Sequence, residues 1–508
     1  MPHGDLAQIA ALAGAAGSVL ALAASRRRFL LAGFALLVGA EAMLAVALVP
    51  RSDLAKLGSP PRIAALALAL LAVVALAALL IRLPALVPLV LLLAAPFRLP
   101  VDLGRQHAFL LLPLYGVLAA AVLAFAYRAA RHPVPRIPWI LAAPAAVFIA
   151  LDGLSLTWSR DVEQGTIELL FFIFPFVALL AVIARAPWVR WLPRALLAGI
   201  VGLACVFSVI GLWQAWTHTL FFAQDLRVAN AYTSYFRVTS VFKDPSLYGR
   251  HLVLAIAVLL VPLWLSRVNL VLGSGLIALL FAGLYFSYSR SSMGVLFVAA
   301  VAVTMVVGDR LGRRVVGVAA LVLVLAAAGI VAAEVQGNSL KRVTSGRSRL
   351  VSVTTTVIHR NPLYGVGVGA QPKASQEETR ARSGPRRVAS HTTPLTVAAE
   401  LGAVGVLAYL ALLAGAARLL LLTRRRYGAV GAGLGAAFLV LFLHSLFYSG
   451  FFEDPITWGV LGVAAVSLAA PALVLEEETA PAAAGEVAAR GPGRARALLG
   501  RAVTHWHT

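Results

Sequence analysis

Long apolar runs dominate the chain, and short polar or basic segments separate them. Runs of about 20 apolar residues are long enough to cross the roughly 30 Å hydrocarbon core of a bilayer as α-helices. The apolar residues are continuous and do not alternate every second position, which argues against a transmembrane β-barrel. The pattern therefore predicts an all-α, polytopic membrane bundle of roughly 12 to 15 spans.

One of the expected spans, at 83–97, is short enough to be half-spanning or interfacial. The expected spans are 6–24, 29–49, 63–81, 83–97, 108–127, 137–157, 166–184, 195–216, 245–265, 268–288, 291–308, 315–333, 394–422, 429–450 and 455–475.

The longest polar interruption late in the chain lies at 334–393. We expect a single transmembrane domain over 1–475 that contains this loop. The segment 476–508 begins with three glutamates, continues with Pro and Ala and ends in a basic stretch. Because it has little apolar content, we expect it to be a disordered cytoplasmic tail.

Composition agrees with a membrane protein, since 61% of the residues are hydrophobic and only 13% are charged. The net charge of +22 would permit nucleic-acid binding. However, the arginines fall mostly in short segments between apolar runs, where membrane topology requires them, so we do not expect a nucleic-acid partner. The single cysteine, Cys205, lies within an apolar run and excludes an internal disulfide or a thiolate metal cluster.

Five arginine clusters fall on one side of the membrane if the spans alternate, and the positive-inside rule makes that side the cytoplasm. The loops at 334–393 and 217–243, the junction at 289–292 and the turn at 451–455 then face outward. The clusters are Arg26, Arg27 and Arg28; Arg128, Arg131 and Arg136; Arg185, Arg190 and Arg194; Arg310, Arg313 and Arg314; and Arg424, Arg425 and Arg426.

The outward loop before the span at 245–265 reads YFRVTSVFKDPSLYGRHL and carries Arg237 and Lys243. Asp244 and the proline that follows it are suited to begin that helix as cap and first-turn residue. Arg250 lies slightly deeper, within the expected span itself. A charge inside a span is a functional candidate by default, although an arginine near a helix end can also extend to the interface.

Arg290 lies between two apolar runs in the motif SYSRSSMG, with serines on both sides. This position places its guanidinium at the membrane boundary. A purely structural interpretation is a tight polar turn. The functional interpretation is a contact with an anion, because the fork of donors in a guanidinium matches phosphate.

The long loop carries Arg347 and Arg349 at the start of a segment in which Leu350, Val353, Thr354 and Val357 recur at helical spacing. We expect an amphipathic helix there. The motif HRNPLYGVGVG follows, in which Pro362 ends the helix and the glycines allow an irregular turn. A dinucleotide site is excluded because no strand precedes these glycines and no βαβ unit surrounds them.

The polar segment 371–390 is expected to be a mobile flap, and His391 then begins the next span. At a helix N-terminus, with arginines nearby, the charged imidazolium is disfavoured, so His391 is a candidate neutral base. We expect Glu400 and His444 to be hydrogen-bonded inside the bundle. The adjacent Glu453 and Asp454 could bind a divalent metal, but such pairs are more often solvated turns.

The order of motifs RVTSVFKDPSLYG, YSRSS, GRSRL with HRNPLYGVGVG, and HTTPLTVAAELGAVG resembles the O-antigen ligase and polymerase family of membrane glycosyltransferases, over roughly residues 237–460. The resemblance implies a GT-C-like fold in a bacterial cytoplasmic membrane. It also implies a polyprenyl-diphosphate-linked glycan donor and no metal or other cofactor. By the same resemblance Arg237, Arg290 and Arg347 would bind the diphosphate and His391 would be the base. Lys243, Arg250, Arg349 and Glu400 are secondary candidates.

The sequence leaves two functional classes open. An enzyme would transfer the glycan to an acceptor hydroxyl of a lipid or protein, as a ligase, or of a growing glycan, as a polymerase. A transporter or flippase would use the same arginines to bind an anionic lipid-linked glycan. The absence of an internal repeat and the collection of candidate groups on one surface favour the enzyme. A structural scaffold would leave His391 and the three arginines unexplained.

Overall fold

The protein is described by a computed structural model, which covers residues 2–48, 60–103, 106–337, 347–379, 390, 392–448 and 450–469. All of these residues except Ala469 belong to one helical unit, Met1–Leu468. The expected tail at 476–508 lies outside the described residues.

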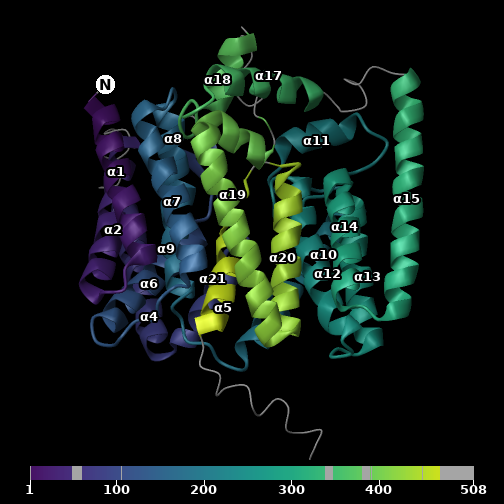
Figure 1. Cartoon of the computed structure of the whole chain (residues 1–508), viewed down its shortest axis with the longest axis horizontal. Coiled ribbons are helices and arrows are strands. Elements are labelled where there is room, and N and C mark those ends of the chain that lie inside the picture. Colours follow the sequence, from purple (N-terminus) through teal and green to yellow (C-terminus); the bar gives the residue numbers. More distant parts are fainter. Residues whose placement is uncertain are drawn as a thin grey trace, which may run out of the picture. The chain divides into compact units, whose positions relative to one another are not determined.

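Membrane-length helices make up most of the described chain, and Figure 1 shows them packed side by side as a bundle. The N-terminal helices are α1 (Pro2–Ala23), α2 (Arg27–Leu48), α4 (Pro60–Arg82), α5 (Val87–Ala94), α6 (Leu112–Ala129), α7 (Trp139–Ser155), α8 (Val162–Glu168), α9 (Phe174–Ile183) and α10 (Leu192–Thr217). The remaining long helices are α12 (Pro245–Trp264), α13 (Leu270–Ser287), α14 (Arg290–Val307), α15 (Arg310–Gly337), α19 (Thr393–Tyr427), α20 (Ala429–Ser445) and α21 (Pro455–Ala469).

The polytopic all-α prediction is confirmed. Among the described residues, 11 helices are long and apolar enough to cross a membrane, and three shorter apolar helices occur at Pro84–Ala94, Ala429–Ser445 and Pro455–Ala469. The first of these matches the short run expected at 83–97 and consists of the 3-10 turn η1 (Pro84–Leu86) followed by α5. α15 coincides with the span expected at 315–333.

Two details of the bundle differ from the expectation. The span expected at 108–127 begins only at Leu112, because residues before it form an antiparallel pair of strands, β1 (Leu99–Leu103) and β2 (Gln106–Leu110). The span expected at 166–184 starts earlier, with α8 joined to α9 through a π-helical turn, η3 (Leu169–Ile173). A short helical turn, η2 (Leu156–Trp158), also connects α7 to α8.

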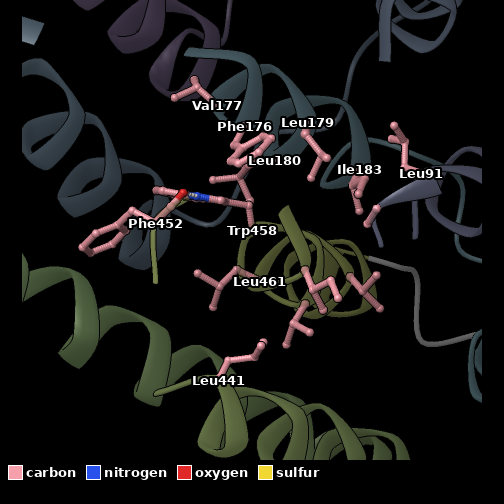
Figure 2. Close-up of a cluster of buried hydrophobic side chains, with 14 of the residues drawn as sticks. Leu91, Phe176, Val177, Leu179, Leu180, Ile183, Leu441, Phe452, Trp458 and Leu461 are labelled. Carbon is pink, nitrogen blue, oxygen red and sulfur yellow. Dashed lines mark hydrogen bonds between the residues drawn. The ribbon is translucent and has the colours of Figure 1, made fainter. Parts of the chain in front are cut away.

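The core is centred on α21, whose residues from Pro455 to Ser467 are all buried. A helix that is apolar on every side belongs in the interior of a bundle. Figure 2 shows Trp458 and Leu461 of α21 between Phe176 and Leu180 of α9 and Leu441 of α20. The indole Nε1 of Trp458 donates to the carbonyl of Phe452 at 2.8 Å, so the one polar atom of this side chain is satisfied.

Arginines from the predicted cytoplasmic clusters bind the C-terminal carbonyls of neighbouring helices. Arg185 is buried and donates to the carbonyl of Leu22 in the last turn of α1 at 3.3 Å. Arg424 donates to Val306 in the last turn of α14 at 3.1 Å, and Arg426 donates to Leu468 at 2.7 Å. Last-turn carbonyls have no partner within their own helix and carry partial negative charge. Arginines from two of these clusters therefore stabilise helix ends.

The segment Asn361–Ala370, here called the glycine segment, is inserted between α19 and the turn that joins α7 to α8. α19 is kinked at Gly402, whose φ is 62°. The kink separates carbonyls and N–H groups that would otherwise pair along the helix. Instead, Val366 and Gly367 donate to the carbonyls of Ala399 and Glu400 at 2.9 and 2.8 Å. In return, the N–H groups of residues 403 and 404 donate to the carbonyls of residues 362 and 363 at 2.8 and 3.3 Å.

The other side of the glycine segment is bonded to the N-terminal helices. The N–H of Val368 donates to Ser155 Oγ at 2.9 Å, and Ser159 Oγ donates to the carbonyl of Val368 at 2.8 Å. The N–H of Arg160 donates to the carbonyl of Val366 at 3.0 Å. The irregular glycine turn predicted from the sequence is thus confirmed, and its buried part, residues 366–370, connects distant parts of the chain.

Substitution of Gly367 by Ala should destabilise the bundle. Gly367 has a φ of 89°, and a Cβ added there would collide with the backbone of Ser159. Positive φ alone costs about 1–3 kcal/mol for a non-glycine residue, and the collision adds to this. The measurement is the free energy of unfolding in mixed detergent micelles.

Gly202→Ala in α10 is the matched control, because a Cβ at Gly202 meets nothing within 4 Å. In a helix interior this change should be neutral or should stabilise by up to about 1 kcal/mol. Equal stabilities of the two variants would contradict the structural role given to the glycine segment.

Candidate functional site

Arg237 is held in place by Asn230, which belongs to the short helix α11 (Gln224–Ala231). The Asn230 side chain accepts from the N–H of Arg237 at 3.2 Å and donates to the carbonyl of the same residue at 3.0 Å. The half-buried Arg237 guanidinium donates through Nε to the carbonyl of Ser287 at 3.3 Å. The following residue, Val238, also bonds to the end of α13, since its N–H donates to the carbonyl of Phe286 at 3.1 Å.

The turn after Arg237 is fixed by the buried Gln214 of α10. Its Oε1 accepts from the N–H groups of Thr239 and Ser240 at 3.1 and 2.7 Å, and its Nε2 donates to the carbonyl of Ser240 at 2.8 Å. Ser240 has a φ of 53°, which is uncommon for a non-glycine residue. The amide of Gln214 therefore compensates a strained turn between Arg237 and α12.

α12 begins as the sequence predicts. Asp244 is its N-cap and accepts from the N–H groups of Ser246 and Leu247 at 2.6 and 3.3 Å. Lys243 is exposed directly before this cap. The loop before α12 is thus fixed at both ends.

Arg290 is exposed as the first residue of α14, and the serines beside it build the turn that carries it. Ser289 is the N-cap, and its hydroxyl lies 2.8 Å from the Ser292 hydroxyl. Ser287 accepts through its hydroxyl from the N–H of Ser289 at 3.2 Å. Ser292 continues this network to His444 of α20, with 3.4 Å between Oγ and Nε2. The expectation that His444 is hydrogen-bonded inside the bundle is therefore met.

Arg237 and the turn of Arg290 are brought together by these contacts. The carbonyl that Arg237 binds belongs to Ser287, only three positions before Arg290. Arg290 also lies at the N-terminus of an 18-residue helix, where unpaired N–H groups and the helix dipole favour an anion. Arg237 thus contacts the turn that carries Arg290 and the N-terminus of α14, a combination that suits phosphate oxygens.

The predicted amphipathic helix exists as α17 (Arg347–Arg360), and the face expected to be apolar is the one turned inward. Thr354 and Val357 are buried and Val353 is half-buried, whereas Val351 and Ser352 are exposed. α17 ends directly before Asn361 and Pro362, as expected from the proline. Its first residue is Arg347, but the side chains of Arg347 and Arg349 lie outside the described part of the structure.

The prediction of a mobile flap at 371–390 is wrong for residues 371–379, which form the helix α18 (Gln371–Thr379). Gln371, Ala374 and Ser375 are buried, because α18 packs against α17 and the glycine segment. Residues 380–389 lie outside the described residues. Figure 1 shows α11, α17 and α18 at the same end of the bundle.

His391 also lies outside the described residues, but both of its neighbours in the chain are described. Ser390 is buried, and its hydroxyl lies 2.6 Å from the hydroxyl of Thr396 in the first turn of α19. Thr392 occupies the N-cap position of α19 without a side-chain capping bond. Its N–H instead donates to Ser390 Oγ at 3.4 Å.

Two secondary candidates have buried partners. Arg250 is buried and forms an ion pair with Asp454, with 3.0 Å between Nη1 and Oδ2. Glu400 is buried in α19 and accepts from the N–H of Gln371 at 3.1 Å. The contacts of both residues are structural, since they join α12 to the turn before α21 and α19 to α18.

Asp454 of the Glu453–Asp454 pair has partners within the protein. Asp454 is bound to Arg250 and also accepts from the N–H of Ile456 at 3.0 Å. Burial raises the pKa of the Glu453 carboxyl, although the nearby Arg98 and Arg250 guanidinium groups lower it in part. No cluster of three or more potential His, Cys, Asp or Glu metal ligands occurs within the described ranges.

The site residues that sequence reasoning missed are Asn230, Gln214 and Gln371, which hold the motif segments in place. Gln214 could have been found as a polar residue inside an apolar run, GLWQAW. Asn230 and Gln371 lie in polar loops, where their composition gives no comparable signal.

These features define a polytopic helical membrane protein in which basic, polar segments collect at one end of the bundle. Comparison with protein families supports a particular assignment. Residues 275–410 match the family model of O-antigen ligase, and this match supports assignment of the chain to the O-antigen ligase and polymerase family. The matched region contains Arg290, Arg347, His391 and Glu400, whereas Arg237 precedes it. No curated protein matches the chain.

The Arg250–Asp454 pair allows a test of its structural role. Replacing Arg250 alone by Met should destabilise the protein by about 3–5 kcal/mol, because Asp454 would be left as a buried charge without a partner. The double variant Arg250→Met with Asp454→Leu should recover most of that loss, because it buries neither charge. The free energy of unfolding of the three proteins is the measurement. A single variant as stable as the parent would show that the pair does not hold α12 to the turn.

Proposed function

We propose that the protein transfers a glycan from a polyprenyl diphosphate to an acceptor hydroxyl at the outer face of the bacterial cytoplasmic membrane. The observation that carries the proposal is the contact between Arg237 and Ser287, which joins two arginine-bearing motifs at the start of α14. The O-antigen ligase match supports glycan transfer by a ligase or polymerase in general. The lipid bilayer, the lipid-linked donor and a glycan, lipid or protein acceptor are the partners that this reaction requires.

In the proposed reaction the bond between the anomeric carbon of the glycan and the diphosphate oxygen breaks. A new bond forms between that carbon and the acceptor oxygen. His391 takes the proton of the acceptor hydroxyl, and polyprenyl diphosphate leaves with the bonding electrons. Arg237, Arg290 and Arg347 stabilise the negative charge that grows on the leaving diphosphate, and guanidinium groups supply this stabilisation without a metal ion.

The arginine distribution supports the proposed outer-face location. Arg185, Arg424 and Arg426 bind the C-terminal ends of α1, α14 and α21, respectively, at the arginine-rich end of the bundle. Arg290 begins α14 and therefore lies at the opposite end of that helix. If the arginine-rich end is cytoplasmic, the proposed site faces outward.

Substitution of His391 by Ala should lower glycan transfer by about 10²–10⁴-fold, the contribution of a general base. The parent protein should also lose activity in acid, because a protonated imidazole cannot accept the proton of the acceptor hydroxyl. This acid limb should be absent from the residual activity of the variant. Transfer in proteoliposomes with a lipid-linked oligosaccharide measures both effects. Unchanged transfer by His391→Ala would remove the base from the mechanism.

Substitution of Arg290 by Ala should lower kcat/KM by about 10²-fold, because one donor to the leaving diphosphate is lost. Lys at the same position should recover only part of the loss, since an ammonium group lacks the guanidinium fork. Arg267→Ala is the matched control, because Arg267 is equally an exposed arginine but follows the C-terminal end of α12. A similar loss in both alanine variants would point to a general effect of surface charge.

Ligase and polymerase differ in the acceptor, and the glycans of a deletion strain distinguish them. Loss of long glycan chains from the lipid carrier indicates a polymerase, whereas long chains that remain unattached indicate a ligase. A transporter would move the lipid-linked glycan across proteoliposome membranes without changing its linkage. That result with purified protein would overturn the proposed glycosyl transfer.

A further inference from the structure

Gln371 occupies a buried junction where four parts of the site end of the bundle meet. Its side chain is buried at the first position of α18, with only 1% of the residue exposed. Nε2 donates to Thr354 of α17 at 3.2 Å and to Ser375 of α18 at 2.8 Å. Oε1 accepts from the N–H of Ser390 at 3.2 Å, and the N–H of Gln371 itself donates to Glu400 of α19 at 3.1 Å.

An amide is the side chain that these partners require. The backbone N–H of Ser390 can only donate, so it needs an acceptor. The Thr354 hydroxyl already donates to the carbonyl of Leu350 at 2.9 Å, so toward Gln371 it acts as an acceptor. Gln presents one acceptor and two donor hydrogens at the same place. A carboxylate would have no hydrogen for Thr354, and an apolar side chain would leave Ser390 N–H without this partner.

The hydrogen bonds of Gln371 extend to the beginning of α19. Ser390, which Gln371 holds by its backbone, binds Thr396 and the N–H of Thr392 through its hydroxyl. Glu400, two turns into α19, holds the backbone of Gln371 in return. Gln371 therefore fixes the start of α19 from both sides and connects it to α17 through Thr354.

An apolar cluster borders the hydrogen bonds of Gln371. Val357, Val366, Ala370, Ala374 and Ala399 form a small apolar cluster around the junction of α17, α18 and α19. A buried polar network among apolar side chains adds little to the free energy of folding, but its directional hydrogen bonds fix the geometry of the elements that it joins. A network of this kind is expected where the relative placement of two elements matters.

From this geometry we infer that Gln371 is a positioning residue, which keeps α17 and the start of α19 in a fixed relation. The inference rests on the proposed function, in which Arg347 on α17 and His391 beside Ser390 act on the same donor. Without Gln371 both elements would still be present, but the separation of α17 from the start of α19 would vary. A misplacement of about 1 Å can lower a catalysed rate by about 10²-fold.

The first test compares Gln371→Met with Gln8→Met. Met keeps the length of the side chain and removes its hydrogen bonds. Gln8 is half-buried and makes a single 3.4 Å bond to the carbonyl of Thr157, so it serves as the matched control. In proteoliposomes with a lipid-linked oligosaccharide, kcat of Gln371→Met should fall by about 10- to 100-fold, while KM for the donor should change by less than about threefold. Gln8→Met should behave as the parent protein.

The second test measures the separation of the two elements without using activity. Spin labels at Ser352→Cys, on the exposed face of α17, and at Leu395→Cys, in the first turn of α19, report their distance in a Cys205→Ala background. The distance distribution should be narrow in the parent and in Gln8→Met, and broad in Gln371→Met. A narrow distribution together with parental kcat in Gln371→Met would overturn the inference.

Two milder variants cover the case in which Gln371→Met does not fold. Thr354→Val keeps the shape of Thr354 and removes the acceptor on α17, and Gln371→Glu keeps the acceptor for Ser390 but loses the donors. Both should broaden the distance distribution and lower kcat, and parental values in both would refute the positioning role. If the parent protein transfers no glycan but the distances broaden as expected, the proposed function is wrong while the junction at Gln371 stands.

Discussion

The arrangement of the site depends on the hydrogen bonds between the glycine segment and the kink of α19. Inside a membrane bundle every backbone polar group needs a partner within the protein. The kink at Gly402 opens helical bonds of α19, and the glycine segment replaces them with its own N–H and carbonyl groups. Because the same segment is bonded to Ser155 and Ser159, the kinked part of α19 is tied to the N-terminal helices.

Two buried glutamines solve the same physical problem in different places. Gln214 holds the turn that follows Arg237, and Gln371 holds the backbone that precedes α19. In each case a side-chain amide satisfies backbone groups of an irregular segment that has no regular partner of its own. Irregular backbone near a membrane is stable only when such partners are supplied. The motif segments are therefore held by residues outside the motifs.

Sequence patterns were sufficient for the features that local chemistry controls. Apolar runs of membrane length predicted the helices, the Asp244 cap predicted the start of α12, and helical spacing predicted the buried face of α17. The helix α18 was not predicted, because its order depends on packing against α17 and the glycine segment. The hairpin of β1 and β2 was not predicted, because the apolar residues from 108 onward were assigned to a membrane span. Composition made 371–379 look like a mobile flap, whereas packing against α17 and the glycine segment orders it. Mutual distances in the site likewise arise from tertiary contacts.

The central position of α21 has a consequence for the way the bundle is assembled. The helix that fills the middle of the core, around Trp458, is translated after the helices that surround it. Until α21 has entered the membrane, the inward faces of α9 and α20 have lipid or each other as neighbours. The helices can be inserted one by one, but their final packing is completed by the last of them. The packing of this bundle is therefore completed by α21, near the C-terminal end of the described chain. A chain that lacks α21 also lacks the centre of the core on which the other helices pack.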